Sequence, residues 1–150
     1  MRLFDYPPIW LAGFVVLAVA VAALLPAVGF GPFGGVARLL GGVLGLAGVG
    51  LMVLAVPAFM RHHTTIVPHR DADALITGGV YAYTRNPIYL GDVLILAGVV
   101  LWLDAVLALP LVPVLAWVLQ RRFILPEEAR LRARFGAVFE SYTRNTRRWI

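Results

Sequence analysis

The sequence predicts an all-α membrane protein: a polytopic bundle of about four transmembrane helices, including a helical hairpin, with an amphipathic carboxy-terminal helix. Hydrophobic residues make up 61% of the 150 residues and charged residues only 14%. Soluble domains are about half apolar and about a quarter charged. A chain this short has room for one domain, and it cannot hide so much apolar surface in a water-soluble core. We therefore expect residues 1–150 to form a single membrane domain.

Two uncharged or nearly uncharged runs in the first half are long enough to cross a bilayer, which takes about 20 apolar residues. They cover residues 9–30 and 39–60. The second run contains Gly41 and Gly45, and small residues at this spacing let helix backbones approach closely in lipid. We expect both runs to be transmembrane helices.

A third apolar run, residues 88–125, is too long for one span. As a straight helix it would reach about 57 Å, nearly twice the bilayer's hydrocarbon thickness of about 30 Å. A charge is costly at mid-membrane but not at a surface turn, so Asp104 is the best position for a break. We therefore expect a helical hairpin with arms at residues 88–103 and 105–125.

The polar material should lie on one side of the membrane. All 13 basic residues are arginine, and with four spans 12 of them fall in the amino-terminal tail, the loop 61–87 and the carboxy-terminal region. Only Arg38 falls on the opposite side. Positively charged loops favour the cytoplasm, so we expect a multi-pass protein of the cytoplasmic membrane with loop 61–87 and tail 126–150 cytoplasmic.

Two segments at that face carry enough polar groups for a site. One is the end of the loop, Gly78–Gly91 (GGVYAYTRNPIYLG), and the other starts the tail at Pro126-Glu127-Glu128. The first leads into one arm of the expected hairpin and the second leaves the other arm. The two segments should therefore be neighbours in space.

The loop motif resembles the G-x-Y-x-x-x-R-[HN]-P-x-Y-x-G signature of the isoprenylcysteine carboxyl methyltransferase family, and related phospholipid methyltransferases share a similar P-x-Y-x-G turn. The resemblance covers roughly residues 61–150, continuing through Glu127-Glu128, Phe135-Gly136 and Tyr142 to Arg148-Trp149. It implies an integral membrane methyltransferase that uses S-adenosylmethionine, with S-adenosylhomocysteine as product. The acceptor would be lipid-like or membrane-partitioned: a carboxylate, an amine or a thiol.

Carried over by position, the resemblance implies specific residue roles. Arg85 and Glu127 take the catalytic positions. The family's substrate-contacting arginine falls on Phe123, so Arg121 or Arg122 would have to replace it. Asn86 stands where the carboxyl methyltransferases usually have histidine. The implied cofactor contacts are Asp73, Ala74, Leu75, Ile76, Tyr81, Asn86, Pro87, Ile88, Tyr89, Gly91, Glu127 and Glu128.

The chemistry of these side chains fits the expected cofactor. Tyr81 and Tyr89 can cover an adenine or a sulfonium by stacking and cation–π contact. The Glu127 carboxylate can pair with the cofactor ammonium or hold a ribose hydroxyl, and Arg85 can take the cofactor carboxylate. Adjacent His62 and His63 seldom face one ion together, so no metal site is expected.

Other interpretations stay open on sequence alone. Glu127-Glu128 suits a helix amino terminus, and the tyrosines suit an interfacial belt. Asp92, one turn inside the membrane, would either pair with an arginine or face the cofactor. A non-catalytic adaptor could use the arginine-rich tail to bind anionic lipid or a partner protein. A transporter is disfavoured because the chain shows few intramembrane charges and no inverted repeat.

Overall fold

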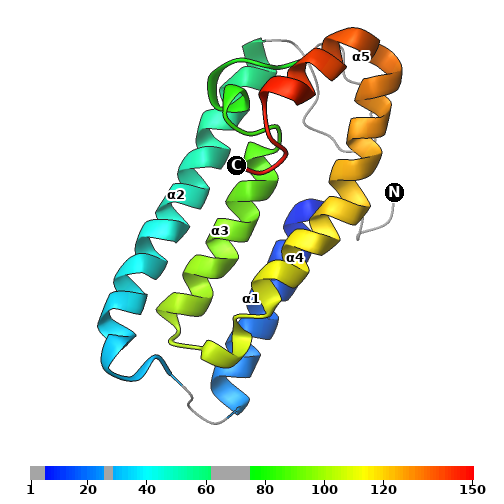
Figure 1. The fold of residues 1–150 in the computed structure, drawn as a ribbon. Coiled ribbons are helices and arrows are strands. Elements are labelled where there is room, and N and C mark those ends of the chain that lie inside the picture. The colour runs from blue at the N-terminus through cyan, green and yellow to red at the C-terminus, as the bar shows by residue number, and fades with distance from the viewer. Residues whose placement is uncertain (1–5, 26–28, 62–74) are drawn as a thin grey trace.

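The computed structural model describes residues 6–25, 29–61 and 75–150, with the side chains of residues 58–61 left out, and every regular element among them is helical. Four main helices stand side by side, and the chain folds back at one end of the bundle (Figure 1). We call this end, which holds the residues from Leu75 to Asn86 and the carboxy terminus, the polar end. Asp73, Ala74 and all three histidines lie outside the described residues.

The first two helices are apolar and largely uncovered by protein. Helix α1 spans Pro7–Leu24 and α2 spans Gly34–Arg61, preceded by a short 3-10 turn, η2, at Gly31–Phe33. Helix α1 starts on proline, whose missing N–H costs nothing in a first turn. Leu25 after it is extended, as expected before a proline. Many of their large apolar side chains are exposed, including Val16, Leu39 and Leu46, and in a membrane lipid covers them.

The expected hairpin is confirmed. Helix α3 spans Pro87–Trp102, and the chain turns at Asp104, which adopts a positive φ of 54°. After the 3-10 turn η4 (Val106–Ala108) the chain returns as α4, Leu111–Leu119. Three helical runs are long and apolar enough to cross a membrane, Pro7–Leu24, Gly31–Pro57 and Val106–Asn145, and α3 is a shorter apolar helix.

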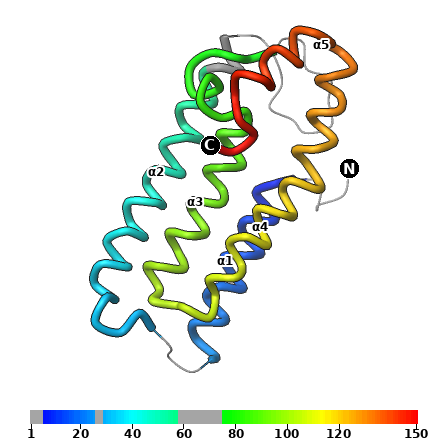
Figure 2. Tube along the Cα trace, in the orientation of Figure 1, coloured from blue at the N-terminus to red at the C-terminus, as the bar shows by residue number. Residues whose placement is uncertain are grey.

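The second arm and the tail differ from expectation, because no break separates them. Helix α4 continues through η5 (Gln120–Ile124), a π-helical turn, directly into α5 (Leu125–Asn145), as Figure 2 shows. Pro126 lies in the first turn of α5, where its ring would clash with a carbonyl of the preceding regular turn. A widened π turn at this point lets the helix continue past the proline. The rod bends at Gly136, whose φ is 49°.

The core joins α1, α3, α4 and η5. Its fully buried residues include Leu96 and Val100 on α3 and Leu115 and Leu119 on α4, with Phe14 of α1 packed against them. At the opposite end from the polar end, Asp104 Oδ1 accepts a 2.8 Å hydrogen bond from the Phe30 backbone N–H. This bond ties the α1–α2 connection to the α3–α4 turn.

Helices α2 and α3 touch through glycines. A Cβ built on Gly48 would lie 2.7 Å from the Gly91 carbonyl oxygen, and one on Gly98 would lie 2.6 Å from that of Gly41. Side chains at these positions would force the helices apart. Of the two glycines noted in the sequence, Gly41 needs the absence of a side chain at this interface, whereas a Cβ on Gly45 would meet nothing within 4 Å. The close approach positions α3.

Gly48→Ala tests this interface. The added methyl group meets backbone and Ile95, so we expect destabilisation of about 1–3 kcal/mol. The matched control is Gly50→Ala in the same helix, where nothing lies within 4 Å of the added Cβ. Alanine there should be neutral or stabilising by about 0.5–1 kcal/mol. Thermal unfolding in nanodiscs measures both, and equal effects would contradict the close approach.

Candidate functional site

The last residues of the chain return to the loop that precedes α3. We call Thr146–Ile150 the carboxy-terminal strap. The Arg85 backbone N–H donates to the Arg147 carbonyl at 3.0 Å, and Asn86 Nδ2 donates to the Arg148 carbonyl at 2.9 Å. Farther back, the Tyr142 hydroxyl donates to the Tyr81 carbonyl at 2.6 Å. These bonds hold the strap and the end of α5 against the loop motif.

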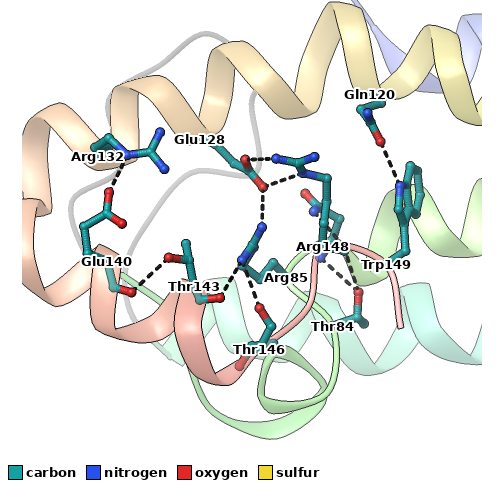
Figure 3. A network of polar contacts seen from close by, with 11 residues as sticks. Thr84, Arg85, Gln120, Glu128, Arg132, Glu140, Thr143, Thr146, Arg148 and Trp149 are labelled. Carbon is teal, nitrogen blue, oxygen red and sulfur yellow. Dashed lines mark hydrogen bonds and ion pairs between the residues drawn. The ribbon is translucent and has the colours of Figure 1, made fainter.

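Glu128 lies between two arginines from opposite ends of this fold-back, as Figure 3 shows. Arg85 Nη2 donates to Glu128 Oε1 at 3.0 Å, and Arg148 donates from Nε to Oε1 at 3.0 Å and from Nη2 to Oε2 at 2.7 Å. The Glu128 side chain is only 8% exposed. We call Glu128 with Arg85 and Arg148 the glutamate clasp. It joins the loop motif, α5 and the strap through charge-assisted hydrogen bonds.

Arg85 also binds the carboxyl end of α5. Its Nη1 donates to the carbonyls of Thr143 at 3.1 Å and Thr146 at 2.9 Å, at the carboxyl end of α5. A cation there satisfies carbonyls that the helix leaves without partners. Arg85 Nε is buried and has no hydrogen-bond partner among the described residues. One N–H donor of this guanidinium therefore has no partner among the described residues.

The adjacent Glu127 has a different environment. Its Oε2 accepts a 3.1 Å hydrogen bond from the Tyr89 hydroxyl, and the Tyr89 ring stacks with Phe123 at a centroid distance of 6.2 Å. Among the described residues no ion pair to Glu127 is found. The two neighbouring glutamates therefore have different partners. Glu128 pairs with arginines, while Glu127 accepts a hydrogen bond from a tyrosine hydroxyl.

The π turn lets the two glutamates contact different partners. Because η5 adds a residue to the turn, Phe123 and Ile124 are buried while Arg121 and Arg122 are exposed. The Arg122 guanidinium lies 5.2 Å from the Trp10 ring centroid on α1. Gln120 accepts a 2.9 Å hydrogen bond from Trp149 Nε1 and so fixes the strap to the same turn.

Electrostatics at the polar end follow from burial and pairing. Burial raises the pKa of the Tyr81 hydroxyl, with smaller contributions from Glu127 and Tyr142, so Tyr81 stays neutral and can donate a hydrogen bond. The hydrogen bonds to Glu128 raise the pKa of Arg148 above its ordinary value. Arg148 therefore remains charged throughout the physiological pH range.

The expected proximity of the two polar segments is found. Tyr89 meets Glu127, and Arg85 meets Glu128, across the junction of α3 with α5. The other implied cofactor residues are mostly buried: Ile76 packs with Ala55 and Tyr81, Ile88 packs beside them, Pro87 begins α3, and Gly91 lies against α2. Leu75 is partly exposed at the start of the described loop.

The sequence resemblance reaches Arg148-Trp149 but implies no role for the rest of the strap. Its signal was present, since arginine and tryptophan at a chain end beside a Glu-Glu pair can form an ion pair and a side-chain hydrogen bond. The sequence does not show whether Arg148 pairs with Glu127 or with Glu128. The bend at Gly136 turns the end of the chain back, so that Arg148 pairs with Glu128.

Comparison with known families identifies the fold. A family model described as phospholipid methyltransferase matches residues 36–138, which include α3, α4 and most of α2 and α5. The chain belongs to the phospholipid methyltransferase family. Searches of curated proteins and of solved structures find no match. The matched region contains the loop motif and both glutamates of this family member, whereas Arg148 of the glutamate clasp lies beyond it.

Glu128→Gln tests the glutamate clasp. It keeps the shape but leaves Arg85 and Arg148 without their shared anion, so we expect a loss of stability on the order of 3 kcal/mol. The control is Glu140→Gln, whose partner Arg132 and own side chain are 52% and 43% exposed. Surface pairs contribute little. Denaturant unfolding measures both, and a Glu128→Gln variant as stable as Glu140→Gln would contradict the account.

Proposed function

We propose that this protein is an S-adenosylmethionine-dependent methyltransferase that acts on a lipid-like or membrane-partitioned acceptor. The observation that carries the proposal is the Tyr89–Glu127 hydrogen bond at the junction of α3 and α5. It places an aromatic ring beside a carboxylate that forms no ion pair with any described residue, inside the region matched by the phospholipid methyltransferase model. Family membership supports methyl transfer, and these two side chains suit its cationic donor.

The residues present fit the proposed cofactor. S-adenosylmethionine carries a sulfonium, an ammonium, a carboxylate and a ribose diol. Glu127 offers an acceptor for the ammonium or the diol, and the Tyr89 and Tyr81 rings offer faces for the sulfonium or adenine. Arg85 Nε is a buried donor without a partner among the described residues and suits the carboxylate. The methyl group that the cofactor supplies is electrophilic because it is bonded to the sulfonium.

The roles of this chain's residues follow from that fit. Glu127 and Tyr89 bind and orient the donor, and Arg85 both holds Glu128 and offers one donor to the cofactor. Glu128 itself is fully engaged by arginines, so its contribution is to position the helix turn that carries Glu127. Displacement at a methyl group depends mainly on alignment and exclusion of water. A rigid junction closed by the strap supplies both.

The proposed topology has the polar end in the cytoplasm. Twelve of the 13 arginines lie on the chain segments assigned to that side. Arg121 and Arg122, exposed beside the π turn, are suited to anionic lipid headgroups or to an acceptor's phosphate. An acceptor dissolved in the bilayer would reach the site from between the helices.

Glu127→Gln and Tyr89→Phe test the cofactor site. Glu127→Gln removes the negative charge but keeps an acceptor oxygen, and Tyr89→Phe removes the hydroxyl donor. We expect each variant to bind S-adenosylhomocysteine about tenfold to hundredfold more weakly, because hydrogen bonds to charged groups contribute about 1.5–3 kcal/mol. Calorimetric titration of the nanodisc-held protein with S-adenosylmethionine and S-adenosylhomocysteine measures this affinity.

Glu140→Gln is the control for these titrations, because its ion pair with Arg132 lies on the exposed face of α5. It should bind like the parent. Variants that fold and bind like the parent would show that the site assignment is wrong. A folded parent that binds neither compound, even with lipid acceptor present, would favour the adaptor interpretation.

A further inference from the structure

Gly136 has a backbone conformation that L-residues avoid. Its φ is 49° and its ψ is -121°, close to the first central position of a type II′ turn, where glycine is preferred. A Cβ built on Gly136 would meet no described atom within 4 Å. Crowding by the described residues therefore does not demand glycine at this position. The demand comes from the backbone angles, because an L-side chain is strained at positive φ.

The bend at Gly136 turns the second half of α5 across the polar end, toward the loop that precedes α3 (Figure 1). The first half of α5 continues the rod formed by α4 and η5. Phe139, three residues after the bend, is 1% exposed, so the second half has a buried face. A helix that ran straight through position 136 would carry residues 137–150 onward along the rod and away from the loop.

The segment after the bend holds two of the proposed cofactor ligands. The Tyr142 hydroxyl donates to the Tyr81 backbone carbonyl at 2.6 Å. The carbonyls of Thr143 and Thr146 accept hydrogen bonds from Arg85 Nη1 at 3.1 and 2.9 Å. These bonds fix the Tyr81 main chain and the Arg85 guanidinium from the side of the bend, in addition to the contacts of the glutamate clasp.

We propose that Gly136 is a positioning residue of the cofactor site. Its conformation orients the second half of α5, and this half helix holds Tyr81 and Arg85 in the geometry that binds the cofactor. The inference rests on the proposed function, in which the Tyr81 ring covers the sulfonium or adenine and Arg85 Nε binds the carboxylate. Gly136 itself touches no ligand and acts through Tyr142 and the last carbonyls of α5.

The mirror-image residue separates the backbone conformation from the added side chain. A D-residue prefers the backbone angles of an L-residue with both signs reversed. With their signs reversed, the angles of Gly136 fall beside the extended region that L-residues occupy. D-Alanine at position 136 therefore keeps the bend, whereas L-alanine strains it, although both add the same methyl group.

Chemical ligation at Ala133 gives the variants as full-length chains. Because the sequence has no cysteine, a synthetic segment covering residues 133–150 can be joined through a cysteine at position 133. Desulfurisation then restores alanine there without altering any other residue. The three products are the parent, Gly136→Ala made with L-alanine and Gly136→Ala made with D-alanine, all reconstituted in nanodiscs.

Amide hydrogen exchange at Arg85 gives a readout without ligand. This N–H donates to the Arg147 carbonyl at 3.0 Å, so its exchange reports detachment of the carboxy-terminal strap. Exchange should be about fivefold to hundredfold faster with L-alanine and like the parent with D-alanine. Calorimetric titration should show S-adenosylhomocysteine affinity lower by about fivefold to hundredfold with L-alanine and unchanged with D-alanine.

Val100→Ala is the control for general destabilisation, because it opens a cavity in the core near the opposite end of α3. It should lower the unfolding temperature and keep the parent's affinity. Equal behaviour of the L-alanine and D-alanine proteins, or parent-like affinity with L-alanine, would overturn the inference. A parent that binds neither S-adenosylmethionine nor S-adenosylhomocysteine would instead refute the proposed function, while the exchange comparison would still decide the role of the bend.

Discussion

The polar end depends on one carboxylate shared by two arginines. Glu128 is the only residue of the described structure that bonds to both the loop motif and the strap through ion pairs. Three charges in a mostly buried setting are stable only when they pair with one another, and here the two guanidinium groups use both carboxylate oxygens. Without this arrangement, the loop before α3 and the end of the chain would have no charged link to α5.

The glutamate clasp explains why adjacent glutamates have different roles. Once Glu128 is turned toward Arg85 and Arg148, Glu127 at the preceding position of the helix faces Tyr89. The π turn and the glycine interface between α2 and α3 complete the placement, because they set the rotation of α5 and the position of α3. The proposed cofactor site derives from this geometry.

Much of the fold follows from sequence because its determinants are local. Pro87 and Asp104 mark the ends of α3 to within two residues, since one favours a first helical turn and the other a surface turn. The continuous α4–α5 rod was not predictable from Pro126, which suits both a helix start and a π turn. The pairing of Glu128 was equally inaccessible, because Arg148 reaches it only through the fold-back at Gly136. The proximity of the loop motif to Pro126-Glu127-Glu128 did follow from the hairpin, although the contact between Tyr89 and Glu127 was not specified.

A double-mutant cycle between Glu128→Gln and Arg148→Gln, read out as S-adenosylhomocysteine affinity, tests the central claim most directly. In the proposed function neither residue touches the cofactor, and both act through the positioning of Glu127. The account predicts that each single change weakens binding and that the double change is no worse than either, with a coupling free energy of about 0.5–3 kcal/mol. Additive effects, or affinity unchanged in all three variants, would show that the glutamate clasp does not position the site.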